Sequence, residues 1–203
     1  MPLLSQTLSQ TFTARNHASL RSRTALAPAR GDRAIAGWPW AATGGRGIVG
    51  TFLARWKAAR QLQSATRPVL LAAARPRGAW ARILVPVDFS AASLAAASLA
   101  ASMDAQLVFL ACFTAADGTA PEASAHVRSR LARLVQQLNI RHDRVSVVVR
   151  RGPLDAAAGA YAGLMRADLI VVGRRRDGAG TLSGRPEWHL ARGIGRDLLV
   201  VPA

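Results

Sequence analysis

The stretch ILVPVD at residues 83–88 has the pattern of a strand buried on both faces. Its apolar run ends at Asp88, and Ser90 follows as a residue type that caps the start of a helix. From there to Met103 the chain is rich in Ala and Leu, which predicts a helix. A buried strand that leads directly into a helix is the unit from which parallel α/β sheets are built.

The same alternation recurs to the end of the chain. Apolar runs predict strands at residues 107–113, 145–149, 168–173 and 197–201. Helices are predicted from Pro121, from Gly152-Pro153 and, as a short element, near residues 186–192. We therefore predict an α/β fold with a five-stranded, mainly parallel sheet and helices on both faces. Ligands of such sheets bind at the carboxyl ends of the strands, where Asp88 and Gly173 are expected to lie.

Composition changes near residue 80. The net charge of +16 is concentrated before that point, where twelve basic side chains accompany a single acid, Asp32. Such a charge attracts nucleic acid without sequence specificity. We expect residues 1–44 to be a disordered basic extension, although the composition of residues 1–30 also fits an organellar transit peptide.

Four segments in the second part resemble the universal stress protein family. They are ILVPVDFS at 83–90, RGP at 151–153, ADLIVVGRR at 167–175 and DLLVVP at 197–202, and they occur in the family's order and spacing. The resemblance covers residues 81–203. It implies a Rossmann-like, adenine-nucleotide-binding fold in a cytoplasmic stress-response protein that is often dimeric. It also implies a regulatory role and no enzymatic turnover.

The resemblance implies a site for ATP or another adenine nucleotide. Members that bind ATP carry Gly-x-x-Gly and a later Gly-Ser or Gly-Thr, because glycines let the backbone approach phosphates. The cofactor-binding positions that match here are Asp88, Val172, Gly173, Arg175, Gly184 and Arg185. Asp88 matches the residue that contacts the ribose and adenine side of the ligand, although such a carboxylate also caps the helix that follows.

The phosphate loop departs from the family pattern. Arg176 stands at the second glycine position, Arg185 replaces the hydroxyl residue, and the loop is two residues shorter. Two interpretations stay open. Either the arginines replace backbone contacts to phosphate, or the loop is degenerate and its arginines are solvated. The second interpretation gives an alternative function, an interaction module of the same fold that binds no nucleotide.

Residues 45–80 resemble the tail of another domain of this family. Gly50-Thr51 is followed by RPVLL at 67–71, which suggests a helix over 52–62 and a strand over 69–72. We therefore interpret this segment as the remnant of a first domain plus a linker; the alternative is an ordinary basic extension. The spacing GxGxxG at 45–50 is discounted as a dinucleotide fingerprint, because WPWAAT at 38–43 makes a poor strand.

The remaining candidates for chemistry are weak. The histidines lack metal-ligand spacing, so we predict no metal site and no catalytic residue. Cys112 lies in an apolar run and is predicted to be a buried thiol. No apolar stretch is long enough to span a membrane. The closing strand at 197–201 is predicted to pair with a second copy and form a homodimer.

Overall fold

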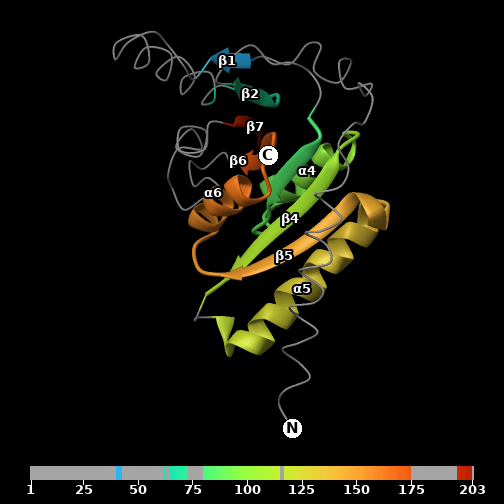
Figure 1. Cartoon of the computed structure of the whole chain (residues 1–203), viewed down its shortest axis with the longest axis vertical. Coiled ribbons are helices and arrows are strands. Elements are labelled where there is room, and N and C mark those ends of the chain that lie inside the picture. The colour runs from blue at the N-terminus through green and yellow to red at the C-terminus, as the bar shows by residue number, and fades with distance from the viewer. Residues whose placement is uncertain are drawn as a thin grey trace.

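The computed structural model describes residues 62, 65–72, 80–114, 117–174 and 196–202, together with the backbone of residues 40–42. In this part of the chain the strands form one sheet (Figure 1). The five strands predicted from the apolar runs are present, as β3 (Arg82–Pro86), β4 (Gln106–Phe113), β5 (Val145–Arg151), β6 (Leu169–Arg174) and β7 (Asp197–Pro202).

These five strands are parallel to one another, in the order β7-β6-β3-β4-β5. The chain therefore builds outward from β3 to β4 and β5, then returns to the other side of β3 for β6 and β7. The strand order reverses between β3 and β6. This point is the usual location of ligand sites in open α/β sheets.

Two further strands extend the sheet to seven and were not part of the five-stranded prediction. β2 (Val69–Ala72), which the sequence indicated as a strand, lies antiparallel to β7, and β1 (Trp40–Ala42) lies parallel to β2. β1 falls in a stretch that its own residues predicted to be a poor strand and a disordered extension. Its three residues form a strand because β2 supplies hydrogen-bond partners that no local pattern reveals.

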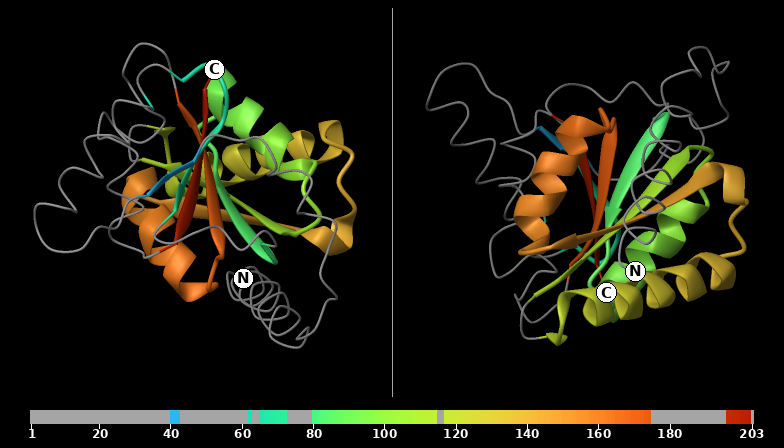
Figure 2. Two further views of the ribbon diagram at one scale, coloured as in Figure 1. Left: turned by 90° about the horizontal axis from the view of Figure 1, so that it is seen from above. Right: turned by 60° about the horizontal axis from the view of Figure 1, so that its bottom comes forward.

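Helices cover both faces of the sheet, as predicted (Figure 2). α4 (Ala91–Ala101) and α5 (Ala120–Gln137) pack on one face, and α6 (Leu154–Leu164) packs on the other. A 3-10 turn, η2 (His142–Arg144), precedes β5. Of the helix suggested at 52–62, the structure describes Leu62 alone, which is helical; the helix predicted near 186–192 lies outside the described residues.

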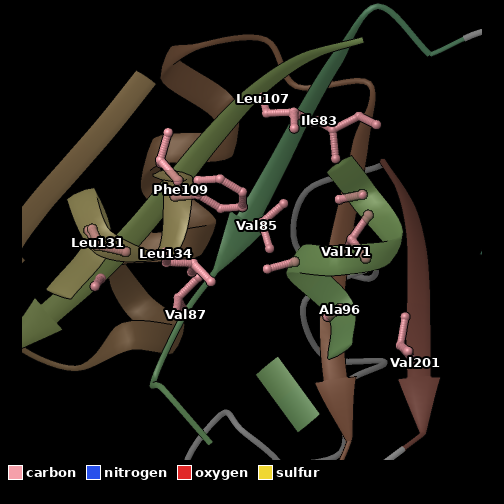
Figure 3. Close-up of a cluster of buried hydrophobic side chains, with 14 of the residues drawn as sticks. Ile83, Val85, Val87, Ala96, Leu107, Phe109, Leu131, Leu134, Val171 and Val201 are labelled. Atoms are coloured by element: carbon pink, nitrogen blue, oxygen red, sulfur yellow. The ribbon is translucent and has the colours of Figure 1, made fainter. Parts of the chain in front are cut away.

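Two apolar clusters form the core, one under each helical layer. Because side chains of a strand alternate between faces, Ile83, Val85 and Val87 point to the α4–α5 side, while Leu84 points to the α6 side. Figure 3 shows the first cluster, in which Phe109 lies among side chains of β3 and α5. α4 contributes mainly alanines, such as Ala96 and Ala97, and these small side chains let the helix approach the sheet closely.

The amino edge of the sheet is tied by two carboxylates. Asp168 accepts hydrogen bonds from the backbone N–H groups of Ala81 and Arg82, at 3.0 and 2.9 Å. Asp197 accepts one from the indole N–H of Trp80 at 3.1 Å. These contacts join the starts of β3, β6 and β7 at the edge opposite to the candidate ligand site.

Candidate functional site

The site predicted from the sequence lies at the carboxyl edge of β3 and β6. These strands are parallel neighbours, with Ile83 opposite Leu169 and Leu84 opposite Ile170. The same register continued to the strand ends brings Asp88, just after β3, level with the last residues of β6. The structure therefore brings Asp88, Val172 and Gly173 to one rim, on the two sides of the point where the strand order reverses.

The carboxylate of Asp88 is bonded to Ser90, which is the N-cap residue of α4. Its Oδ1 accepts hydrogen bonds from the backbone N–H of Ser90 at 2.9 Å and from the Ser90 hydroxyl at 2.6 Å. The Ser90 Oγ in turn accepts a hydrogen bond from the backbone N–H of Ser93 at 3.2 Å. The residue that caps α4 is thus Ser90, and Asp88 holds this cap in place without bonding to the helix itself. Both bonds use Oδ1 on an exposed side chain, so Oδ2 is available to a ligand hydroxyl.

Phe89 fixes the shape of the turn between Asp88 and Ser90. Its φ of 63° is in the left-handed region, which is uncommon for a bulky residue and is found mostly where the surroundings impose it. The ring packs against the α4–α5 cluster, and the guanidinium of Arg130 from α5 lies 3.9 Å from its centroid. No glycine or asparagine marks this backbone turn in the sequence, so sequence reasoning missed it.

Gly173 allows β6 to approach the first turn of α4. A Cβ at this position would lie 2.1 Å from both the carbonyl carbon and the oxygen of Ala92, and 2.4 Å from the backbone nitrogen of Ser93. Real Cβ atoms do not come this close to backbone, so only glycine fits. The glycine that the sequence assigned to phosphate approach is required by helix packing whether or not a phosphate binds.

Of the other predicted binding residues, one is buried and three lie outside the part of the chain that the structure describes. Val172 is fully buried on the α6 side of the sheet. Arg175, Gly184 and Arg185 lie outside the described residues. Their neighbour Arg174 ends β6 and donates a hydrogen bond to the backbone carbonyl of Leu62. One arginine of the predicted cluster is therefore engaged by the segment that precedes the domain.

A second polar group at this rim follows β4. Asp117 accepts hydrogen bonds from the backbone N–H and the hydroxyl of Thr114, and these bonds hold the pKa of the Asp117 carboxyl below its usual value. Gly118 next to it has a φ of 107° and permits the turn into α5. The Asp-Gly pair indicated a loop here, but gave no sign that its carboxylate faces back to the end of β4.

The thiol of the single cysteine is unreactive at neutral pH. Cys112 is half-buried in β4, and desolvation raises the pKa of its thiol to about 11, although Arg150 on β5 acts in the opposite direction. At neutral pH almost all of it is therefore protonated and a poor nucleophile.

Within the described part of the chain, no three His, Cys, Asp or Glu residues gather where a metal ion would bind. In that same part, no helix has the length and apolar character needed to cross a membrane.

The model of the universal stress protein family matches residues 79–202, which is more than half of the chain. The chain belongs to the universal stress protein family. The resemblance stated from four sequence segments is thereby confirmed, over nearly the range that was expected. No curated protein gives a significant match.

Solved structures of universal stress proteins share the fold. One from Archaeoglobus fulgidus is 16% identical, with a TM-score of 0.52 over 84% of this chain and 64% of that chain. A functionally unknown protein from Pseudomonas aeruginosa PAO1 is 14% identical, with a TM-score of 0.51 over 100% of this chain and 79% of the other. A universal stress protein in complex with cAMP is 22% identical, with a TM-score of 0.45 over 61% of this chain and 98% of that one. At such identities, the likeness to the first two of these structures shows the fold alone.

Proposed function

We propose that this universal stress protein binds an adenine nucleotide, such as ATP, where β3 and β6 end, and that it uses the nucleotide in a regulatory stress response. The observation that carries the proposal is the placement of Asp88 and Gly173. They come from neighbouring parallel strands on the two sides of the point where strand order reverses. The family resemblance supports the regulatory role and a cytoplasmic location.

The chemistry of the rim suits a ribose and a phosphate. The exposed Oδ2 of Asp88 is an acceptor for a sugar hydroxyl. The amino end of α4 lies next to Asp88, and its first turn holds no acidic residue to compete with an anion. We propose Arg175, Gly184 and Arg185 as the residues that contact the phosphates.

The variant Asp88→Asn separates the ligand role of Asp88 from its support of the Ser90 cap. An asparagine oxygen still accepts the bonds from Ser90, so we expect the unfolding temperature to change little. The loss of a charge-assisted bond to the ribose should weaken ATP binding about tenfold, measured by isothermal titration calorimetry at moderate salt.

Asp143→Asn is the matched control, since it removes the same charge from an exposed residue at the opposite edge, before β5. It should bind ATP like the unaltered chain. Equal affinity of the Asp88→Asn variant and the unaltered chain would exclude Asp88 from the site.

The close contact of Gly173 is equally consistent with a second candidate function, an interaction module that binds no nucleotide. Because packing against Ala92 accounts for this glycine, its presence does not by itself indicate phosphate binding. Denaturing the purified protein and analysing what it releases separates the two functions. An adenine nucleotide in the released material supports the first, and none, together with no heat in the ATP titration, supports the second.

We also propose two macromolecular partners, a second copy of this chain and nucleic acid. A homodimer through the C-terminal strand would need an edge of β7 that β2 already occupies in this chain. Non-specific binding of nucleic acid would use the basic side chains before residue 81, most of which lie outside the described residues.

A further inference from the structure

β5 is an outer strand of the sheet, beside α5 (Figure 1). Among the described strands it pairs with β4 and with no other. Its side chains are covered less completely than those of its neighbour. Phe109 and Leu110 of β4 are fully buried, whereas Val147 and Val148 directly opposite them are partly exposed. The edge of β5 therefore offers apolar surface and main-chain groups to a further strand.

The pairing with β4 determines which main-chain groups of β5 face outward. The backbone N–H of Gly152 donates a hydrogen bond to the carbonyl oxygen of Phe113 at 2.9 Å, so Gly152 faces β4. The N–H and C=O groups of one residue in a strand point to the same side, and successive residues alternate. No other described residue bonds to the outward groups of β5. Counted back from Gly152, the outward residues are Arg151, Val149, Val147 and Val145.

Arginine side chains lie at the carboxyl end of this open edge. Arg150 and Arg151 are exposed, and they lie on opposite faces of the sheet because side chains of a strand alternate. On the α6 face, the guanidinium of Arg150 lies 5.7 Å from the centroid of the Tyr161 ring. Arg151 makes no ion pair within the described part of the chain. Both faces of the edge thus carry a positive charge.

A third arginine lies beside this edge on α5, which packs over β4 and β5. The guanidinium of Arg130 lies over Phe89 and so marks the flank of α5 that faces the start of α4. Arg128 is two residues earlier, which places it about 200° around the helix from Arg130. Because the buried stripe of α5 lies between these two side chains, the exposed Arg128 is on the opposite flank, beside the outer edge of β5.

The acidic side chains near this edge are mostly engaged elsewhere. Asp143, before β5, is paired with Arg141 at 2.8 Å. Glu122, at the start of α5, accepts a hydrogen bond from the hydroxyl of the residue that caps the helix, at 2.7 Å. Asp155 lies in the first turn of α6, on the same face as Arg150. The other two arginines at this edge have no carboxylate partner among the described residues, so the edge is basic.

We propose that the outer edge of β5 binds an extended acidic segment of another protein as an additional strand. The outward main-chain groups of β5 would hold the backbone of this segment, and the three arginines would bind its carboxylates. The first 80 residues of this chain are unsuited to the edge, because they carry twelve basic side chains and one acid. A second copy that paired by its own β5 would bring arginines against arginines. The inference does not depend on nucleotide binding.

Fluorescence anisotropy of a labelled acidic peptide, added to the full chain, tests this inference. The probe Asp-Glu-Val-Thr-Val-Thr-Val-Glu-Asp alternates like a strand and carries acids at both ends, so it suits either strand direction. We expect it to bind with an affinity that falls as salt is added. A peptide with proline in place of each valine keeps the charges but cannot form the ladder, and should bind at least about tenfold more weakly. Equal binding of the two peptides would exclude strand addition.

Variants of the chain locate the binding site. Val147→Pro removes one outward N–H of β5, at a position where an edge strand tolerates proline. It should weaken binding of the probe at least about tenfold while circular dichroism stays native. Arg151→Glu is the second variant in case the proline unfolds the chain. It leaves the main chain intact and should weaken binding by a similar factor, because attraction becomes repulsion.

Arg133→Glu is the matched control, since it makes the same change of charge at an exposed side chain of α5. Arg133 is three residues after Arg130, on the side of the helix away from the edge of β5, so this variant should bind the probe like the unaltered chain. A folded Val147→Pro variant that binds the probe as tightly as the unaltered chain would overturn the proposal.

A single-stranded oligonucleotide is the competing partner, because arginines also attract phosphates. If the oligonucleotide bound more tightly than the peptide and lost affinity in the Arg151→Glu variant, the edge would serve nucleic acid and the proposal would be wrong. We expect the opposite order at this edge, with oligonucleotide binding unchanged by Arg151→Glu.

Discussion

Two physical reasons can account for a glycine at position 173: the approach of a phosphate to the backbone, or the close packing of β6 against α4. The sequence associated it with a phosphate loop, since a glycine at a strand end lets a ligand approach the backbone. The structure shows that the space above its Cα is occupied by the backbone of Ala92 and Ser93. Because that contact joins residues far apart in the sequence, no local pattern could have revealed it.

Gly173→Ala is predicted to destabilise the fold by about 3 kcal/mol, because the added methyl group meets rigid backbone and the end of β6 must move away from α4. The free energy of unfolding, measured with urea, checks this value. Gly163→Ala is the matched control, since a Cβ there meets nothing within 4 Å in α6. It should stabilise by about 0.5–1 kcal/mol, because alanine loses less backbone entropy in a helix. Similar effects of the two substitutions would mean that β6 does not lie against α4 as described.

Elements with a strong local signal were predicted well from the sequence. β3, β4, β6 and β7 are nearly continuous apolar runs, which strands covered on both faces require. α5 was visible because Val127, Leu131 and Leu134 recur at helical spacing and are buried in the structure. β1 was not predicted, since three residues carry no period and its stability comes from β2. The left-handed turn at Phe89 escaped prediction for the same reason, as tertiary packing imposes it.

The amino ends of β6 and β7 bring two carboxylates near each other. Burial is the main cause that raises the pKa of Asp197, the bond from Trp80 opposes it, and the charge of Asp168 adds to it. Because the pKa in the folded state lies above the ordinary 3.8, the folded state keeps this proton to higher pH than the unfolded state. The contribution to stability is therefore complete below about pH 3.8, and it is lost as the pH rises through the raised pKa.

Asp197→Asn should therefore stabilise the protein relative to the unaltered chain at neutral pH, and this advantage should vanish in acid. The amide oxygen still accepts the bond from Trp80 but carries no charge to desolvate. Denaturant unfolding of both proteins from pH 3 to pH 7 gives the difference. Trp80→Phe is the companion variant, because it removes the bond that lowers the pKa and should make the pH dependence of stability steeper. A constant difference across this range would show that Asp197 does not titrate with folding.

At the scale of the whole molecule, the sequence predicted which residues lie at the carboxyl edge of the sheet. It did not predict how the first 80 residues extend that sheet. Asp88 and Gly173 were placed on one rim because parallel strands end together, and the structure agrees. What the sequence left open was the relation of the first 80 residues to the sheet. A strand such as β2 has only four residues, and its pairing with β7 spans more than a hundred positions of the chain. Pairing between segments so far apart in the chain depends on the edge that β7 offers, which no local pattern reveals.

Hydrogen exchange can measure whether β2 is a full member of the sheet. If β2 unfolds only together with the core, the amides of Leu70 and Leu71 should be protected as strongly as those of Leu198 and Leu199. A strand that only rests on the edge would open locally and exchange at least about 100-fold faster than β6, since each 1.4 kcal/mol of lower opening energy gives a factor of ten. Exchange of the full chain for short and long times, followed by acid proteolysis and mass spectrometry of the peptides that contain each strand, separates these cases. Leu164→Asp, a change at a side chain that is 65% exposed on α6, should leave the protection unchanged. Because a strand that opens only with the core exchanges through global unfolding, Leu70→Ala should lower the protection of β2, β7 and β4 alike, whereas local opening would confine the loss to β2.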